Sequence, residues 1–361
     1  MEDVVSIDLA SAYRRRRVLL TGHTGFKGSW LALWLKHLGA EVTGYALAPE
    51  YENSHFEQLD LGTQIKHVIA DVRDSEALAS TVSDAQPEFI FHLAAQALVR
   101  RAYDDPKTTF DTNVGGTVNL LEATRAADTV RALVFVTSDK AYRNKEWTWG
   151  YRENDELGGQ EPYGASKAAA ELVFTAYHES FFRQRPDLGV VTTRAGNVIG
   201  GGDWALYRII PDCIRALQAE EPVVLRNPSA TRPWQHVLDT LYGYLHLGAA
   251  LANDPARFSG AWNFGPEIDT GLTVRQLAEG AVEQWGAGEV AAAEEDLGPF
   301  EHKLLQLNID KARLKLGWRP VWSSEQAIDK SIWWYRQVFA GVDVRQTSLS
   351  QIIEFMAATS D

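Results

Sequence analysis

The sequence predicts an α/β protein in which a doubly wound parallel sheet carries a smaller C-terminal lobe. Short runs of β-branched and apolar residues alternate with longer segments of helical periodicity, which is typical of parallel strands covered on both faces. The chain has 361 residues, of which 45% are hydrophobic, and this is enough for a large domain with a second lobe.

The expected sheet is formed by six short apolar runs in the first 200 residues, at 18–21, 41–45, 67–70, 89–93, 132–137 and 190–194. Amphipathic helices lie between them, for example at 27–38 and 114–127. A helix at 237–251 and a strand-like segment at 261–265 are apolar enough to return to the sheet. We therefore expect a sheet domain over 14–197, joined by 237–265, and a smaller lobe from 198–236 and 266–345.

Composition limits the possible partners and the compartment. The chain has 35 Lys and Arg against 48 Asp and Glu, a net charge of -13, which argues against a nucleic-acid surface. No stretch approaches the roughly 20 apolar residues that span a bilayer, and the start lacks a signal-peptide pattern. The single cysteine, Cys213, cannot form an internal disulfide, which favours a reducing compartment. We expect a cytoplasmic protein with no nucleic-acid partner, no membrane partner and no metal site.

A glycine-rich turn joins the first strand to the first long helix. Gly22 permits a tight turn, Gly25 lets backbone N–H groups approach a pyrophosphate, and Gly28 lets helix and strand pack closely. The N-terminus of the helix then presents its positive end to the phosphates. The turn predicts a dinucleotide site formed by Gly22, His23, Thr24, Gly25, Phe26 and Gly28.

The ends of the next strands indicate which dinucleotide is bound. The second strand ends in YALAPEYEN, which has neither the usual acid for the adenosine ribose nor an arginine for a 2′-phosphate, and this favours NAD over NADP. After the third strand, Asp71 with Val72 could bind the adenine amine, or Asp71 could cap the helix near Ser75, and the two readings are about equal. After the fourth strand, the segment that should approach the nicotinamide ribose is Leu93, Ala94, Ala95 and Gln96.

The segment PYGASKAAAEL places Tyr163 and Lys167 four residues apart, on one face of a helix. A nearby ammonium favours the phenolate, which would make Tyr163 a base near neutral pH. Alone this pair is a weak signal. Together with the glycine turn, about 140 residues earlier, it resembles the extended short-chain dehydrogenase/reductase family, which has a Rossmann-type fold. The resemblance implies Tyr163 as base, Lys167 as its electrostatic helper and ribose ligand, and Ser138 or Thr137 as the accompanying hydroxyl.

The fifth strand ends in Ser138, Asp139 and Lys140. The ordinary interpretation is an ion pair at a strand end. Nucleotide-sugar 4,6-dehydratases carry hydroxyl-Asp-Glu here, and the lysine resembles one branch of them, the CDP-glucose 4,6-dehydratases. The chain resembles the same branch over 18–334, and the segments that carry the resemblance are TGHTGFKGSW, HLAAQALVR, TSDKAY, GNVIGGGDW, RPWQHVLD and WNFGP.

This resemblance implies Asp139 as the acid at C6 and Lys140 as the base at C5, and it leaves open a swapped or shared assignment. Lys140 must be neutral to accept a proton, so its surroundings would have to lower its pKa. Arginine suits a diphosphate, and the residues implied to bind the substrate are Gln96, Thr137, Asn197, Arg208, Arg232 and His302.

The implied reaction converts CDP-glucose to CDP-4-keto-6-deoxyglucose and water, with NAD recycled, as in deoxysugar biosynthesis. The cytidine follows from the resemblance alone. The alternatives are an NAD-dependent nucleotide-sugar epimerase or reductase on the same fold, and a non-catalytic NAD sensor. As in relatives, helices at 114–127 and 166–182 imply a homodimer, and a homotetramer stays open.

Overall fold

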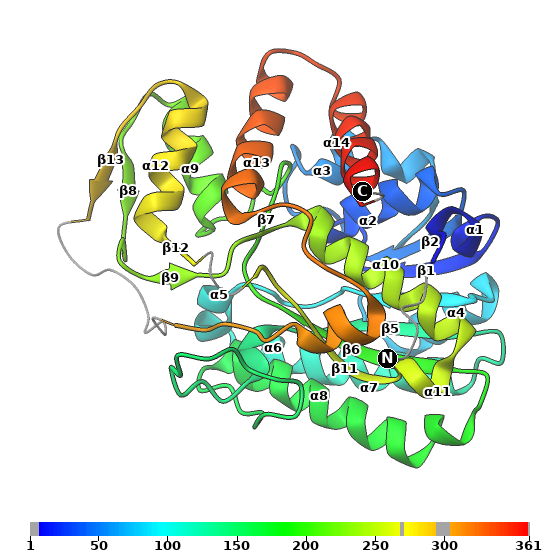
Figure 1. The fold of residues 1–361 in the computed structure, drawn as a ribbon. Coiled ribbons are helices and arrows are strands. Elements are labelled where there is room, and N and C mark those ends of the chain that lie inside the picture. The colour runs from blue at the N-terminus through cyan, green and yellow to red at the C-terminus, as the bar shows by residue number, and fades with distance from the viewer. Residues whose placement is uncertain (1–6, 268–270, 294–303, 360–361) are drawn as a thin grey trace.

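The structure is a computed structural model that describes residues 7–267, 271–293 and 304–359. Its centre is a seven-stranded parallel sheet in the order β11-β6-β5-β4-β1-β2-β3 (Figure 1). The strands are β1 (Arg17–Thr21), β2 (Glu41–Ala46), β3 (Lys66–Ile69), β4 (Phe89–His92), β5 (Ala132–Val136), β6 (Gly189–Ala195) and β11 (Gly260–Phe264). The doubly wound sheet predicted from the sequence is therefore confirmed, with strand ends shifted by at most one residue.

The sheet buries both faces, because successive side chains of a strand point to opposite sides. In β1, Val18 and Leu20 belong to one hydrophobic cluster and Leu19 to another. The first cluster is covered by α2 (Phe26–His37), α10 (Val237–Asn253) and α14 (Val344–Ala358). The second is covered by α4 (Ser75–Ala85), α7 (Gly116–Arg125) and α8 (Pro162–Ser180). Figure 1 shows α7 and α8 on the opposite side of the sheet from α2 and α10.

Helices α9 and α12 and three pairs of short strands lie to one side of the sheet (Figure 1). These elements and α13, which stands beside them, are β7 (Val198–Ile199), α9 (Ile209–Gln218), β8 (Val223–Leu225), β9 (Thr231–Arg232), β10 (Gln235–His236), β12 (Leu272–Thr273), α12 (Val274–Trp285), β13 (Val290–Ala292) and α13 (Ser324–Phe339). The first hydrophobic cluster continues from the sheet into this region through Leu217 and Leu277. The exact boundary between the two lobes stays a prediction.

Short helical segments complete the chain, namely α1 (Leu9–Tyr13), α3 (His55–Gln58), η1 (Leu61–Thr63), α5 (Val99–Asp104), α6 (Pro106–Phe110), η2 (Asp111–Gly115), η3 (Asp139–Ala141), η4 (Phe182–Gln184), α11 (Pro255–Phe258) and η6 (Ala312–Leu316). The helix expected at 114–127 begins as the π-helical turn η2 before it becomes α7. Among the described residues, no helix has both the length and the apolar character needed to cross a membrane.

Candidate active site

The glycine turn between β1 and α2 is closed so tightly that two of its glycines are sterically required. Gly22 has a φ of 76°, and a Cβ there would lie 2.7 Å from the backbone nitrogen of Ala94. A Cβ on Gly28 would lie 2.0 Å from the carbonyl oxygen of Gly22. Gly25 caps α2 without a side-chain hydrogen bond, so the first N–H groups of the helix remain available for an anion. The turn fits the pyrophosphate of a dinucleotide.

The neighbours of the turn bring its expected cofactor residues together through their backbones. Thr24 donates its hydroxyl to the carbonyl of Leu47 after β2 (2.9 Å). After β4, Leu93 N donates to Thr21 O (3.1 Å) and Ala94 N to Thr21 Oγ1 (3.2 Å), which places the loop of Ala94 and Ala95 directly against the turn. The edges of β1, β2 and β4 thus meet at one place.

His23 occupies the inner side of the turn. Its side chain is fully buried, and its Nε2 lies 2.6 Å from Nδ1 of His67. Burial and the neighbouring His67 lower the pKa of His23 to about 3, so the imidazole is neutral at physiological pH. The His23 side chain is therefore a packing group, and any contact it makes with a cofactor would come from its backbone.

Two further cofactor predictions concern the loop after β3 and the start of α2. The carboxylate of Asp71 pairs with Arg73 (2.6 Å), and α4 is capped by Asp74, which accepts from Ala77 N. The capping role considered for Asp71 is therefore wrong, because the neighbouring Asp74 is the residue in position to cap. Val72 is buried. Phe26 opens α2, and its ring packs next to Gly200.

The catalytic pair lies at the start of α8, where a local cap fixes the first turn. Pro162 is the first residue of the helix, and the Glu161 carboxylate accepts from the backbone nitrogens of Tyr163 and Gly164, both at 2.7 Å. Tyr163 and Lys167 are both buried, one helical turn apart. Lys167 Nζ donates to the carbonyl of Val136 (3.3 Å), which ties the pair to the end of β5.

The charge state expected for Tyr163 needs a correction. Burial raises the pKa of Tyr163 to about 12, while the Ser138 hydroxyl and the Arg208 guanidinium act in the opposite direction. Burial also lowers the pKa of Lys167 to about 8, and the Glu171 carboxylate opposes that effect. The sequence reasoning assumed that a nearby ammonium would outweigh desolvation. In the protein alone, desolvation dominates the pKa of Tyr163.

The end of β5 carries the hydroxyl, the acid and the amine that the sequence singled out. Ser138 Oγ donates to Asp139 Oδ1 (2.9 Å) and accepts from Lys140 N (3.2 Å), which closes the 3₁₀ turn η3. Burial raises the pKa of the Asp139 carboxyl, and Lys140, Ser138 and Arg232 counteract the rise. Asp139, Lys140, Asn197 and Arg232 line one pocket, with about 660 Å³ of space not filled by atoms. This pocket, called the substrate pocket below, also borders α5 through Val99 and Tyr103.

Two residues expected to touch the substrate have their side chains engaged elsewhere. The Thr137 hydroxyl donates to Glu171 (2.5 Å), which forms a buried ion pair with Arg194 (2.8 Å). The Gln96 side chain donates to Thr109 Oγ1 (2.9 Å) and accepts from the backbone of Leu98 (2.7 Å). Both side chains therefore support the loops around the site, and a contact of either with a substrate stays a prediction.

The remaining substrate predictions fall on both lobes. Asn197 and Arg232 line the substrate pocket. Arg208 donates to Asp203 (3.0 Å) and is close enough to Tyr163 to influence its pKa. His302 lies outside the described residues.

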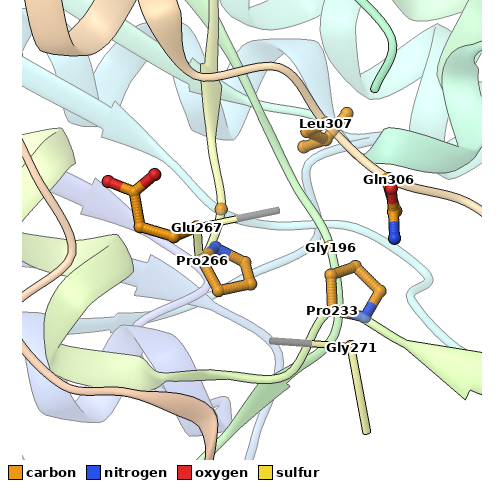
Figure 2. A pocket seen from close by; sticks show the side chains of 8 residues that line it. Gly196, Pro233, Pro266, Glu267, Gly271, Gln306 and Leu307 are labelled. Atoms are coloured by element: carbon orange, nitrogen blue, oxygen red, sulfur yellow. The ribbon is translucent and has the colours of Figure 1, made fainter. Parts of the chain in front are cut away.

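A second pocket is lined by Gly196 and Pro233, the sequence neighbours of Asn197 and Arg232 in the substrate pocket (Figure 2). Figure 2 shows Pro233 and Pro266 in its wall, with Glu267 and Gln306 at different sides. A Cβ on Gly196 would lie 3.3 Å from Asp139 Oδ2 and 3.3 Å from Pro233 Cγ, so this glycine lies between the second pocket and the acid. The absence of a side chain at this position leaves space beside Asp139.

Sequence reasoning missed Lys27, which stands in the first turn of α2. Its Nζ lies 6.0 Å from the centre of the Tyr244 ring. Burial lowers the pKa of Lys27 to about 7; Arg208 and Lys167 lower it further, whereas Asp139 and Asp203 raise it. No carboxylate of the described residues forms an ion pair with it within 4.0 Å. The position of this lysine inside the apolar run FKGSWLALWL could have identified it as a buried charged residue.

A glycine-rich dinucleotide turn and a Tyr-Lys helix that meet on a parallel sheet define the short-chain dehydrogenase/reductase class. Within the described residues, no group of three or more His, Cys, Asp or Glu side chains could hold a metal ion. The profile of the GDP-mannose 4,6-dehydratase family matches residues 19–331, and the chain belongs to this family.

Individual relatives narrow the comparison. The chain is 43% identical over 352 residues to the CDP-glucose 4,6-dehydratase of Salmonella typhimurium, covering 96% of this chain and 98% of that protein. Among solved structures, it resembles the UDP-glucose 4-epimerase of Thermus thermophilus in complex with NAD (TM-score 0.74, 28% identity, 89% of this chain and 99% of the other). It also resembles a double mutant of the dTDP-glucose 4,6-dehydratase of Streptomyces venezuelae with NAD bound (TM-score 0.76, 25% identity, 91% and 99%).

Proposed function

We propose that this protein is a lyase that converts CDP-glucose to CDP-4-keto-6-deoxyglucose and water. The observation that carries the proposal is the Ser138-Asp139-Lys140 triplet, in a chain 43% identical to a CDP-glucose 4,6-dehydratase. Asp139 and Lys140 line the substrate pocket, and the Ser138 hydroxyl is close enough to Tyr163 to lower its pKa. An epimerase or reductase has no step that needs an acid and a base of this kind at C5 and C6.

NAD is the cofactor of this proposal. The Gly22 to Gly28 turn and the N-terminus of α2 would hold its pyrophosphate. Gly28 is needed there because any side chain at this position would keep α2 from packing against the turn. The absence of an arginine after β2 favours NAD over NADP. When bound, NAD accepts the C4 hydrogen with its electron pair and returns it at C6, so that turnover has no net redox change.

Tyr163 is the proposed base for the O4 proton of the sugar. Its high pKa means that the phenolate must be stabilised when the site is complete, and the Ser138 hydroxyl and Arg208 guanidinium already act in that direction. Lys167, one turn further along α8, is the proposed electrostatic helper and ribose ligand. The lowered pKa of Lys167 means that burial destabilises its charged form.

Asp139 and Lys140 would carry out the elimination. With C4 oxidised, Lys140 would accept the acidified C5 proton, the C6–O bond would break, and Asp139 would protonate the leaving hydroxyl as water. Lys140 would then return a proton to C5 when hydride is delivered to C6. The raised pKa of Asp139 suits this role, since a proton donor must hold its proton at working pH. Asn197, Arg208 and Arg232 are the proposed ligands of the sugar diphosphate, and the cytidine is proposed from the Salmonella relative.

Isotope transfer tests the reaction. Deuterium placed on C4 of CDP-glucose should appear in the methyl group of the product, and a C6 that keeps its hydroxyl would instead favour an epimerase. Lys140→Gln should abolish the exchange of the C5 hydrogen with solvent, whereas Lys145→Gln, a lysine paired with Glu156 nearby, should not. Normal C5 exchange in Lys140→Gln would refute its role as base.

Two coarser properties complete the proposal. A homodimer through α7 and α8 is supported by Leu172 of α8, whose side chain is 62% exposed, and Leu172→Glu should shift light scattering toward the monomer. A cytoplasmic location is supported by the free, buried thiol of Cys213, since disulfides are rare in reducing compartments.

A further inference from the structure

A carboxylate and a guanidinium are buried together between α8 and β6. Glu171 of α8 and Arg194 of β6 are both almost completely shielded from solvent. The guanidinium donates to both carboxylate oxygens, from Nε to Oε1 (2.8 Å) and from Nη2 to Oε2 (2.9 Å). Removing two charges from water is costly, and apolar side chains of similar volume are often equally stable at such positions. Stability alone therefore does not explain this pair.

The Glu171 carboxylate fixes the start of the segment that carries the proposed acid and base. The hydroxyl of Thr137 donates to Oε1 (2.5 Å) and the hydroxyl of Thr192 donates to Oε2 (2.8 Å). Together with the two bonds from Arg194, each carboxylate oxygen accepts two hydrogen bonds. Thr137 directly precedes Ser138, so the start of the triplet 138–140 is tied to α8.

The Arg194 guanidinium fixes the other end of the same triplet. Its Nη1 donates to the hydroxyl of Tyr142 (2.8 Å) and to the carbonyl of Glu153 (3.0 Å), and its carbon lies 4.7 Å from the centre of the Tyr142 ring. Tyr142 ends the turn η3 and lines the substrate pocket. The triplet 138–140 thus lies between Thr137 and Tyr142, which are both bonded to one ion pair.

The ion pair is also coupled to Lys167, one helical turn before Glu171 on the same face of α8. Lys167 Nζ donates to the carbonyl of Val136 (3.3 Å), and Glu171 accepts from Thr137, the next residue of the chain. Burial lowers the pKa of Lys167 to about 8, and the Glu171 carboxylate opposes that effect. Both side chains therefore hold the end of β5 against α8.

We propose that Glu171 and Arg194 form a positioning pair, which holds the triplet 138–140 at both ends and aligns it with Tyr163 and Lys167. This inference rests on the proposed function. Neither member of the pair lines the substrate pocket, so the pair acts through the residues that it holds. Its loss should slow the chemical steps and have little effect on substrate binding.

Glu171→Gln tests the pair, because the amide keeps the shape of the side chain and removes its charge. We expect kcat to fall by about 100-fold and the KM for CDP-glucose to change by less than about 3-fold. The Tm should fall as well, because the charge of Arg194 is left buried without a partner. Glu171→Asp, which keeps the charge, should restore a large part of the lost kcat.

The pH profile of kcat gives a readout that a purely structural role would not change. Lys167 must be protonated to stabilise a phenolate, so activity is lost as pH rises through its pKa. Without the Glu171 charge this pKa falls further, and the alkaline limb of the profile should move to lower pH in Glu171→Gln. The limb should remain at its wild-type position in Glu171→Asp.

A double substitution separates positioning from folding. Glu171→Leu combined with Arg194→Met leaves no unpaired charge, so the Tm should recover toward the wild-type value while kcat stays low. Glu179→Gln is the matched control on the same helix, where Glu179 forms an exposed pair with Arg183 (2.7 Å). This control should leave kcat, KM, Tm and the pH profile unaltered.

Three results would overturn the positioning pair: an unchanged kcat in Glu171→Gln, an alkaline limb that does not move in this variant, or a double variant that recovers kcat together with Tm. A wild type that forms no 4-keto-6-deoxy sugar would instead refute the proposed function. In that case the ratio of hydride transfer in Glu171→Gln to that in the wild type would still test the pair.

Discussion

Asp139 and Lys140 follow one another in the chain but have different surroundings. Asp139 is buried at the end of β5 and bonded to Ser138, whereas Lys140 is only half-buried in the wall of the substrate pocket. The acid is therefore desolvated, which keeps its proton in place, while the amine remains in reach of a ligand. Such a division of roles follows from burial and could not follow from residue type alone.

Replacing Asp139 by Asn should separate the two halves of the reaction. The amide keeps the shape of the side chain but cannot donate an acidic proton, so kcat should fall by at least about 100-fold. Oxidation at C4 should persist, seen as near-ultraviolet absorbance of reduced nicotinamide that accumulates on the enzyme. The half-buried acid Asp155, whose carboxylate accepts from the backbone nitrogen of Arg152, serves as control when it is replaced in the same way. Equal loss of both steps in Asp139→Asn would assign the carboxyl to something other than water elimination.

Lys27 should act on substrate binding through its charge. Its pKa of about 7 lets it be protonated when an anion arrives, and the diphosphate of the substrate would add to the negative charge of Asp139 and Asp203, which already raises this pKa. Lys27→Met retains most of the side-chain volume, and we expect it to raise the KM for CDP-glucose about 10-fold. Lys36→Met, on the exposed part of α2, should leave KM unaltered. Unchanged KM in the Lys27 variant would place this lysine outside the substrate's reach.

At the scale of elements, substitutions at two glycines of the turn test which of them is required for the packing of α2 against β1. Gly28→Ala would place a methyl group 2.0 Å from Gly22 O, so α2 would have to move away from β1. We expect this variant to lose about 1–3 kcal/mol of stability, measured by urea unfolding, together with NAD affinity. Gly25→Ala, with its nearest contact at 3.4 Å, should keep its stability. Equal unfolding midpoints for the two variants would contradict the steric account.

The elements also show how far local sequence reaches. Apolar runs such as Ala132–Val136 predicted the strands, because a strand buried on both faces has little alternative. The orientation of the Gln96 amide depends on Thr109, and that of the Thr137 hydroxyl on Glu171, which are distant partners that no local pattern specifies. The direction of the Lys27 side chain and the pKa of Tyr163 depend likewise on tertiary burial. The position of the site was predictable, and its charge states were not.

At the scale of the whole molecule, buried histidines link stability to pH. Burial lowers the pKa of His23, His55, His92 and His236 to about 3 each, from 6.5. Between pH 6.5 and about pH 3, these imidazoles are protonated in the unfolded chain and neutral in the folded chain. The free energy of unfolding therefore falls as pH decreases through this range. Asp239 acts oppositely, because burial raises its pKa to about 7 and the folded chain retains that proton. Burial also raises the pKa values of Asp139, Glu153 and Asp212, which therefore act in the same direction as Asp239. We expect the four imidazoles to dominate, which predicts a net loss of stability.

The Tm should therefore decrease clearly between about pH 7 and about pH 5. His55 bonds Ser29 and Ser348 through its two ring nitrogens, both at 2.9 Å, and His55→Gln should reduce this pH dependence. His37→Gln, at an exposed position, should leave it unaltered. A Tm that does not change over this range would show that the buried imidazoles do not control acid stability.

The two lobes share one continuous core. Trp30 of α2 donates its indole N–H to the carbonyl of Gly201 (2.9 Å), and Tyr335 of α13 donates to the carbonyl of Asp203. The segment from Asn197 to Arg208 is thus hydrogen-bonded to α2 and to α13. These contacts argue against a hinge motion of one lobe relative to the other, so we expect a ligand to enter a pocket that is already formed.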